Sequence, residues 1–249
     1  MSLYKRVDAN KAVIDGVRPF EGEYLRQLRE YYRIGLTWTS NAIEGNSLTE
    51  LETKILLEDG MTVGGKPLRD TFEALGHSVA YDYMFALLGE RRITVEDIKS
   101  LHRLFFKSID EDNAGKWRDV SIVVTGTNYA FSAPSKLAML MEDLGQWIET
   151  DRSKMHPIHF AAMLHLKFVT VHPFIDGNGR VARLLLNTAL IQDGYLLAVV
   201  PPILRQEYMA AIRGYQQEGV TDPFCDFIAE RVLESEKEVM RMFHISPMG

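Results

Sequence analysis

Cysteine is almost absent from this sequence: Cys225 is the only one among 249 residues. A single cysteine forms no internal disulfide and no cysteine-rich zinc site, which favours a reducing compartment. The first 18 residues mix charged and apolar side chains and lack the apolar segment of a secretory signal. These features together predict a cytoplasmic protein.

Long apolar runs and basic tracts are also missing. The longest apolar stretch begins at Leu184 and is interrupted by Asn187, Gln192 and Asp193, so it is too short to span a bilayer. The formal net charge is -6 and no long Lys/Arg tract occurs. The sequence therefore gives no sign of sequence-independent binding to nucleic-acid phosphates. We therefore expect neither a membrane nor a nucleic-acid partner, while a local basic site remains compatible with the net charge.

Strand-like alternation is confined to one passage. Within Ser121–Phe131, Ile122 and Val124 alternate with other residues, and Gly126 and Asn128 supply turn residues, the pattern of a short hairpin. Elsewhere the apolar spacing is helical. The predicted fold class is therefore all-α with one short β-hairpin.

Capping residues support several of the expected helices. Thr49 and Glu52 are expected to form a capping box, although Ser47 competes for the cap. Gly60 predicts the end of that helix, and Thr94 predicts the start of a further one. The helices before and after residues 172–179 are expected to be antiparallel neighbours. Helices are expected at about 25–36, 49–60, 72–83, 94–105, 134–147, 157–171, 180–193, 203–218 and 223–243.

The chain length suits one large domain or a core with a smaller helical extension. The composition, 46% hydrophobic, is ordinary for a globular protein. We divide the chain into an N-terminal helical region, residues 1–90, and a core with the C-terminal helices, residues 91–249.

The most informative stretch is residues 172–180, which read HPFIDGNGR, followed by Arg183. Two glycines flank Asn178, so successive backbone N–H groups can turn into one anion-binding concavity. The helix expected to start near Arg180 adds unpaired N–H groups and the positive end of its dipole. Arg180 and Arg183 lie three apart and can bind phosphate oxygens together.

Two further side chains of this stretch suit chemistry at phosphorus. Asp176 is a hard carboxylate of the kind that binds Mg²⁺ while waters and phosphates complete the shell. His172 has an ordinary pKa near about 6.5, suited to a general base. Each residue alone is explained by a turn, a helix cap or a solvated face, but their combination within twelve residues is not.

The stretch resembles the signature of the Fic family, HPFxxGNGRxxR, and matches each fixed position. The resemblance extends to residues 115–118 (GKWR) and to the passage up to Phe131, covering roughly the last 150 residues. It implies a Fic-type helical core that transfers AMP from ATP to a hydroxyl group of a protein and releases pyrophosphate. ATP and Mg²⁺ are the implied cofactors.

The resemblance also implies roles for the matched residues. His172 would deprotonate the target hydroxyl, and Asp176 would hold Mg²⁺. Arg180 would bind the β-side phosphates, Arg183 the γ-phosphate, and Asn178 would steady the α-phosphate. The implied nucleotide-binding set is Phe174, Gly177, Asn178, Gly179, Arg180 and Arg183.

The predicted hairpin has a role in the same picture. The backbone near Thr125–Tyr129 would pair with an extended segment of the protein substrate, as in strand addition. Tyr208 and Tyr215 lie seven apart on one helical face and are candidates for contacts with adenine, although an aromatic stripe also suits a core.

A second motif lies near the N-terminus. Ser40 and Glu44 are one helical turn apart, and Gly45 predicts the helix end. The passage resembles the family's inhibitory motif, [S/T]xxxE[G/N], which implies that Glu44 pairs with Arg183 and displaces the γ-phosphate. Its position before the core is similar to the second of the family's three arrangements. Without the resemblance, the passage is an ordinary helix end.

Three other kinds of site do not fit the sequence. A zinc site at His156, His159 and His165 lacks further ligands, so these side chains are expected at a helix start or in packing. Residues 177–182 fit G-x-G-x-x-A, but the preceding strand of a dinucleotide-binding unit is absent. No Walker-type phosphate loop occurs.

Three alternatives remain open from the sequence: a non-catalytic interaction module, transfer of another phosphate-bearing group, and removal of AMP from a target. The sequence names neither the target protein nor the modified residue type. The oligomeric state is also open, a homo-oligomer included.

Overall fold

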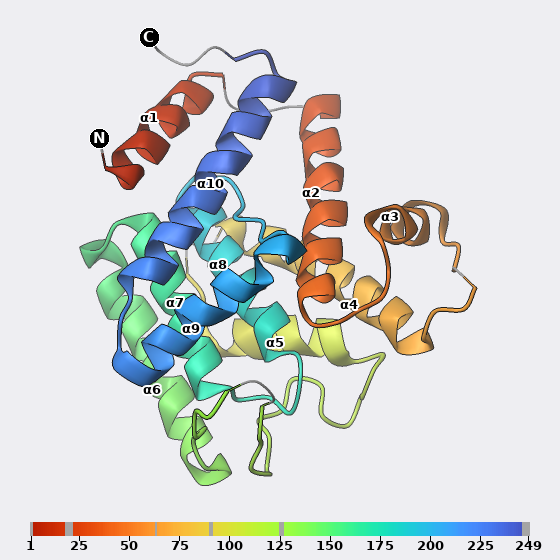
Figure 1. Cartoon of the computed structure of the whole chain (residues 1–249), viewed down its shortest axis with the longest axis vertical. Helices are drawn as coiled ribbons and strands as arrows, with labels where there is room; N and C mark the ends of the chain where they lie inside the picture. The colour runs from red at the N-terminus through yellow and green to blue at the C-terminus, as the bar shows by residue number, and fades with distance from the viewer. Residues whose placement is uncertain (1, 18–21, 63, 90–91, 125–126, 246–249) are drawn as a thin grey trace.

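The computed structural model describes residues 2–17, 22–62, 64–89, 92–124 and 127–245, with the side chains of residues 22–24 left out. Over these ranges the chain forms α-helices joined by connections that are mostly short, with one long irregular segment, residues 107–133, between α5 and α6 (Figure 1). The helices are α1 Leu3–Asp15, α2 Gly22–Ile43, α3 Glu50–Asp59, α4 Leu68–Ala86, α5 Val95–Phe106, α6 Leu137–Asp151, α7 Pro157–Val171, α8 Asn178–Gln192, α9 Arg205–Glu218 and α10 Asp222–Met242. Short 3-10 turns cover Leu87–Gly89, Pro134–Lys136, Arg152–Lys154 and Pro202–Leu204.

The predicted β-hairpin at Ser121–Phe131 is wrong, because the described residues contain no strand; residues 125 and 126 of its turn lie outside them. The alternating side chains of Ile122 and Val124 are only half-buried, so they do not join the core. The two arms are instead held by a side chain: Arg118 donates to the carbonyl of Val120 at 2.8 Å and to that of Ser132 at 2.6 Å. We call residues 119–133 the flap.

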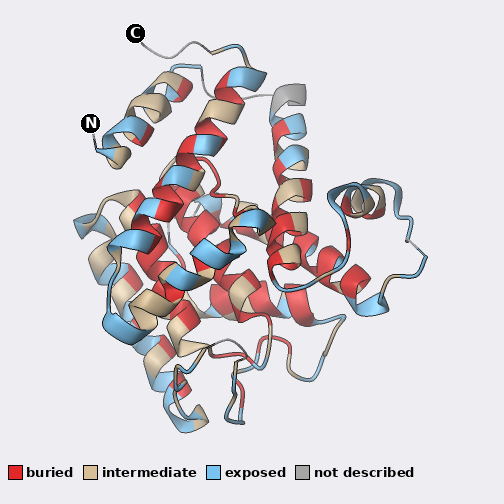
Figure 2. Cartoon of the chain, viewed as in Figure 1, coloured by how far each residue is buried: buried red, intermediate tan, exposed pale blue. Residues whose placement is uncertain are grey.

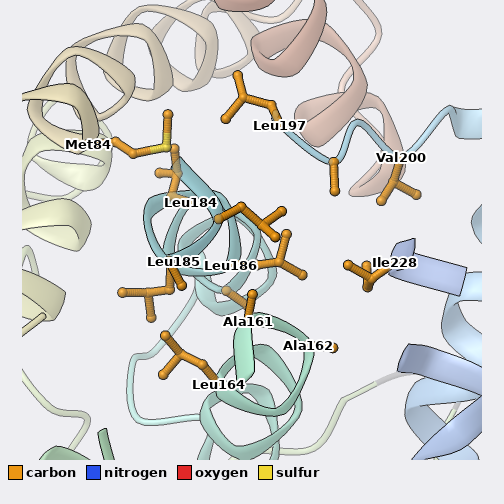
Figure 3. Close-up of a cluster of buried hydrophobic side chains, with 14 of the residues drawn as sticks. Met84, Ala161, Ala162, Leu164, Leu184, Leu185, Leu186, Leu197, Val200 and Ile228 are labelled. Atoms are coloured by element: carbon orange, nitrogen blue, oxygen red, sulfur yellow. The ribbon is translucent and has the colours of Figure 1, made fainter. Parts of the chain in front are cut away.

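Helices α7 and α8 form the centre of the core. Side chains such as Ala161 and Leu164 of α7 meet Leu185 and Leu186 of α8 (Figure 3). Burying a leucine side chain contributes roughly 1.5–3 kcal/mol, so this interface is a major source of stability. The connection between the two helices, residues 172–177, is short, so the packed helices run antiparallel. The predicted helix pair around the signature loop is therefore confirmed.

Local capping chemistry fixes several helix ends. The Thr49 side chain accepts from the Glu52 N–H, and the Glu52 carboxylate accepts from the Thr49 N–H at 2.7 Å. Gly60 ends α3 in the left-handed region with φ of 66°. Thr94 opens α5 through a capping box with Asp97. These three sequence predictions are confirmed.

Helix α1 was not predicted, because only Val7 and Ile14 of its thirteen residues are buried. It packs against α10, so the two ends of the chain lie in the same part of the molecule (Figure 1). One cluster of buried side chains runs from Val7 to Met240 across both predicted regions. The boundary between residues 90 and 91 stays a prediction.

Burial is greatest where α4, α5, α7 and α8 meet, and the outer faces of α6 and α10 carry the exposed residues (Figure 2). No helix in the described ranges combines the length and the hydropathy needed to cross a bilayer. The signature loop, residues 172–177, emerges from this buried centre, which gives its side chains a rigid base.

Candidate active site

The signature loop begins and ends with left-handed backbone. His172 follows α7 with φ of 52°, and Gly177 precedes α8 with φ of 78°. A positive φ is costly for a residue other than glycine, so His172 needs support. Its N–H donates to the carbonyl of Phe168 at 3.0 Å, and its own carbonyl accepts from Nε of Arg118 at 3.0 Å. The loop therefore holds a strained histidine in one place.

Asn178 closes the loop from inside. Its side-chain oxygen accepts from the N–H of Phe174 at 3.0 Å, and its side-chain nitrogen donates to the carbonyl of Phe174 at 2.9 Å. Phe174 is fully buried, and its ring stacks on that of His102 with centroids 3.7 Å apart. Both residues were predicted to contact nucleotide. In the structure, the contacts of both side chains hold the loop in its conformation.

His102 supports the same loop and was missed in the sequence. Its Nδ1 accepts from the N–H of Gly115 at 2.9 Å, which leaves Nε2 to donate to the carbonyl of Asp176 at 3.1 Å. Burial lowers the pKa of His102 to about 4, so the ring is neutral and the donor and acceptor roles are fixed. A lone histidine on a helix gave no signal in the sequence, because its partners lie far along the chain.

The start of α8 presents backbone N–H groups of the kind that bind anions. The first helical hydrogen bond runs from the N–H of Val181 to the carbonyl of Gly177 at 3.0 Å. The N–H groups of residues 178–180 precede it and have no partner inside the helix. Arg180, 4% exposed, has an Nε that finds no partner in the part of the chain that the structure describes. The helix start and Arg180 thus bring donors to this end of the loop, and the anion site expected from the glycines and arginines stays a prediction.

His172 stands at the other end of the loop. Its Nδ1 lies 3.2 Å from the carbonyl of Val169, so the proton belongs on Nδ1 and Nε2 keeps its lone pair. Its ring contacts Phe131 of the flap, with centroids 4.6 Å apart. Burial is the main cause that lowers the pKa of His172 to about 4, and Arg118 adds to the effect. A neutral imidazole with a free Nε2 is the state that a general base requires.

Asp176 is the one carboxylate of the loop, and its side chain is 44% exposed. Its Oδ1 accepts from the N–H of Gly177 at 2.6 Å and lies 3.2 Å from Nη2 of Arg180. No cluster of three or more His, Cys, Asp or Glu side chains among the described residues is arranged to hold a metal. A single exposed carboxylate fits Mg²⁺, which typically keeps waters and nucleotide phosphates as its other ligands.

Arg183 meets the inhibitory motif at the centre of the molecule. Its Nε donates to Oγ of Ser40 at 2.8 Å, and its Nη2 donates to the carbonyl of Ser40 at 2.7 Å. The same Nη2 lies 2.8 Å from Oε1 of Glu44. Ser40 lies in the last turn of α2 and Glu44 directly follows that helix. The predicted contact between Glu44 and Arg183 is present in the structure.

Glu44 also covers the glycine of the anion site. A Cβ placed on Gly179 would lie 2.2 Å from Oε1 of Glu44, so only glycine permits this approach. Burial opposes the charged carboxylate, but Arg183 and Arg180 lower the pKa of Glu44 below its ordinary value. A negatively charged group thus lies against the first turn of α8.

The two predicted adenine residues have different surroundings. Tyr208, 1% exposed, lies with its hydroxyl 3.3 Å from Nη1 of Arg183 and 2.6 Å from Nε2 of His165. It therefore supports Arg183 from the core. Tyr215 is half-buried, and burial together with the neighbouring Tyr129 raises its pKa. Of the two, only Tyr215 borders the flap.

Two of the three histidines for which a zinc site was rejected lie where the sequence predicted, at a helix start and in the core. Nδ1 of His156 accepts from the N–H of Ile158 at 3.3 Å and caps α7. His165 is fully buried and stacks on Phe224, with centroids 4.7 Å apart. Both serve the helix start or the core.

The fold and the site define a helical domain with a glycine-rich loop, in which a neutral histidine and an exposed carboxylate lie together. Residues 92–190 match the model of the Fic/DOC family. Residues 92–190 therefore form a Fic/DOC family domain.

Relatives support this assignment over most of the chain. The "Protein adenylyltransferase Fic" of Drosophila grimshawi is 38% identical over 232 residues, which are 92% of this chain and 46% of that protein. That of Drosophila willistoni is 35% identical over 226 residues, 90% of this chain and 45% of that protein. The chain thus spans about half the length of these curated relatives.

Solved structures agree with the fold. Residues 134–508 of Fic-1 from C. elegans match with a TM-score of 0.86 and 29% identity, covering 98% of this chain and 74% of that one. A Fic domain containing signaling protein from Bacteroides thetaiotaomicron also matches with a TM-score of 0.86, at 25% identity, covering 98% and 99% of the two chains.

Proposed function

We propose that this protein is an adenylyltransferase that moves AMP from ATP to a hydroxyl side chain of a target protein and is restrained by Glu44. The observation that carries the proposal is the placement of a base and an anion site at the two ends of one loop. His172 offers a free Nε2 at the start of the loop, and the N–H groups of residues 178–180 lie at its end. The name of the Drosophila relatives supports the same activity.

The chemistry follows from these positions. Nε2 of His172 takes the proton of the target hydroxyl, whose oxygen then attacks the α-phosphorus. The bond between the α-phosphorus and the bridging oxygen of the β-phosphate breaks, and pyrophosphate leaves. The first turn of α8, with Arg180 and Arg183, binds the phosphates and stabilises the charge that develops on them. Asp176 would hold Mg²⁺, which neutralises phosphate charge when bound.

The restraint rests on the contact between Glu44 and Arg183, 2.8 Å in length. A γ-phosphate needs the arginine that Glu44 occupies, so ATP would bind without its α-phosphate in line with the target hydroxyl. Because Ser40 and Glu44 precede the core in the same chain, this corresponds to the family's second arrangement.

A protein substrate would dock at the flap. The arms at residues 121–124 and 127–133 form no helix and no strand, so their backbone groups are not used in secondary structure and suit pairing with an extended peptide. Thr125 of the predicted docking range Thr125–Tyr129 lies outside the described residues. The cytoplasm remains the proposed location, on the strength of the single free cysteine.

Intact-mass spectrometry after incubation with ATP and Mg²⁺ tests the proposal. Glu44→Gly should gain the mass of one or more AMP groups, and wild type should gain fewer. The double variant Glu44→Gly/His172→Ala is the matched control and should gain none. A different mass increment would identify another transferred group, and loss of AMP from a premodified target would identify the reverse reaction. No change in any variant would favour a non-catalytic module.

A further inference from the structure

Four charged side chains form a closed ring beside the signature loop. Asp176 pairs through Oδ2 with Nη2 of Arg69 at 2.5 Å, and Nε of Arg69 pairs with Oε1 of Glu73 at 3.1 Å. The same Oε1 pairs with Nη1 of Arg180 at 3.0 Å, and Nη2 of Arg180 returns to Oδ1 of Asp176 at 3.2 Å. The first turns of α4 thus reach into the predicted metal site.

The four members of the ring are unequally free to move. Arg180 and Glu73 are almost buried, with 5% and 8% of their side chains exposed. The Glu73 carboxylate is fixed further, because its Oε2 accepts from Asn46 at 3.0 Å. The Arg69 side chain is 54% exposed. The contact between Arg69 and Asp176 is therefore the one that opens at least cost.

Both oxygens of Asp176 are occupied in this ring. Oδ1 is held by Gly177 and Arg180, and Oδ2 is held by Arg69. Because Oδ1 already accepts two hydrogen bonds and Oδ2 only one, a divalent cation would bind at Oδ2 and compete there with Arg69. The exposure of Arg69 makes it the donor that leaves, and a cation next to a guanidinium adds repulsion in the same direction.

We propose that Arg69 is a phosphate ligand that Mg²⁺ releases: its guanidinium holds Oδ2 of Asp176 until the cation takes that oxygen, and then binds a phosphate oxygen of the nucleotide. Glu73 keeps Nε of the displaced arginine beside the site, so its Nη2 stays close to the cation. A group with several anionic oxygens, such as the di- or triphosphate chain of a nucleotide, satisfies a cation and a guanidinium placed side by side. This inference rests on the proposed function, because it takes Asp176 as the metal ligand.

Two measurements test the two parts of the proposal separately: metal binding tests the competition between Arg69 and the cation, and nucleotide binding tests the contact of Arg69 with phosphate. Mn²⁺ binding to the nucleotide-free protein is measured by electron paramagnetic resonance, and binding of a fluorescent ADP analogue is measured with and without Mn²⁺. The variants are Arg69→Gln and Arg69→Lys. Arg92→Gln is the matched control, because Arg92 is also an exposed arginine paired with one carboxylate, that of Glu149, away from the loop.

Arg69→Gln should bind Mn²⁺ about two- to five-fold more tightly, the scale of a half-exposed ion pair. With Mn²⁺ present it should bind the ADP analogue about three- to ten-fold more weakly, because one charged hydrogen bond is lost. Arg69→Lys should lie between it and wild type, and Arg92→Gln should match wild type.

Unchanged or weaker Mn²⁺ binding in Arg69→Gln would overturn the competition, and unchanged binding of the ADP analogue would overturn the phosphate contact. If Arg69→Gln lowers the midpoint of urea unfolding by more than Arg92→Gln, the same two affinities are read from Arg69→Lys. Asp176→Asn should lose Mn²⁺ binding altogether. If wild type binds no ADP analogue, the proposed function fails, and this result is distinct from any effect of Arg69.

Discussion

Nε of Arg118 lies 3.0 Å from the carbonyl oxygen of His172, so a guanidinium far from the signature loop in sequence fixes the backbone of its histidine. The same side chain binds the carbonyls of Val120 and Ser132, one in each arm of the flap. The N–H of Arg118 also donates to the carbonyl of Pro173 at 2.9 Å. One almost buried arginine therefore sets the position of the flap relative to His172.

Arg118→Met should destabilise the protein and loosen this arrangement. The change removes three side-chain donors and leaves their carbonyl partners unpaired, which costs about 2–4 kcal/mol in the free energy of unfolding. Urea unfolding measures the loss. Arg103→Met is the control, since Arg103 is an exposed arginine of α5. Equal losses in the two variants would contradict the role assigned to Arg118.

Acid should destabilise the protein before its carboxylates titrate. Burial lowers the pKa of His77 to about 3, with Arg183 and Arg180 adding to the effect, and lowers that of His102 to about 4. The unfolded chain takes up these protons below about pH 6.5, whereas the folded protein does not until the pH is much lower. Stability should therefore be level above pH 7 and fall between about pH 6.5 and 4.

The size of that loss can be measured by urea unfolding at pH 7.5, 6 and 5. Each of these two histidines should contribute about 1–2 kcal/mol of destabilisation by pH 5. His77→Gln should reduce the pH dependence by the share of one histidine, whatever its own stability at pH 7.5. A free energy of unfolding that is constant down to pH 5 would contradict the burial of neutral histidines.

The parts of the site that the sequence predicted are local in the chain. His172, Asp176 and Arg183 fall within twelve residues, and Ser40 and Glu44 are one helical turn apart. Their chemistry is visible because helix periodicity and glycine conformations act over short distances. The contact of Glu44 with Arg183 crosses 139 residues, and only the resemblance to the Fic family implied it.

The parts that the sequence missed depend on long-range contacts. His102, Arg118 and Arg69 reach partners that are 74, 54 and 107 residues away, and the sequence predicted no role for any of them, although Arg118 lies in the stretch 115–118 that resembles the family. The flap was predicted as a hairpin because alternation alone does not show whether a face is packed. Phe174 shapes the loop from inside the core, and its contact with the nucleotide stays a prediction.

His172→Ala should abolish AMP transfer and leave nucleotide binding largely intact. The imidazole acts on the target hydroxyl, while the phosphate donors come from the first turn of α8. Labelled ATP measures transfer, and a fluorescent ATP analogue measures binding. His159→Ala, a change in the half-buried first turn of α7, is the control and should keep both. Parallel loss of binding and transfer in His172→Ala would give His172 a binding role instead.

The last prediction concerns the glutamate that covers the anion site. Glu44→Gly should raise AMP transfer, because Arg183 becomes available to the γ-phosphate while Ser40 and Tyr208 still hold it in place. Glu44→Gln should give only part of the gain, since an amide loses the charge but still occupies the space above Gly179.

Arg183→Ala should not imitate Glu44→Gly, because it removes the partner of the glutamate and the partner of the γ-phosphate together. The double variant should then resemble Arg183→Ala alone, as expected for two residues that act through one contact. A coupling of about 1–3 kcal/mol corresponds to about five- to a hundred-fold in rate if it falls wholly on productive binding. Rates of self-modification with labelled ATP, measured for the four proteins, decide between these outcomes. Additive effects of the two changes would mean that Glu44 and Arg183 act independently, and an unchanged rate in Glu44→Gly would leave residues 40–45 as a plain helix end.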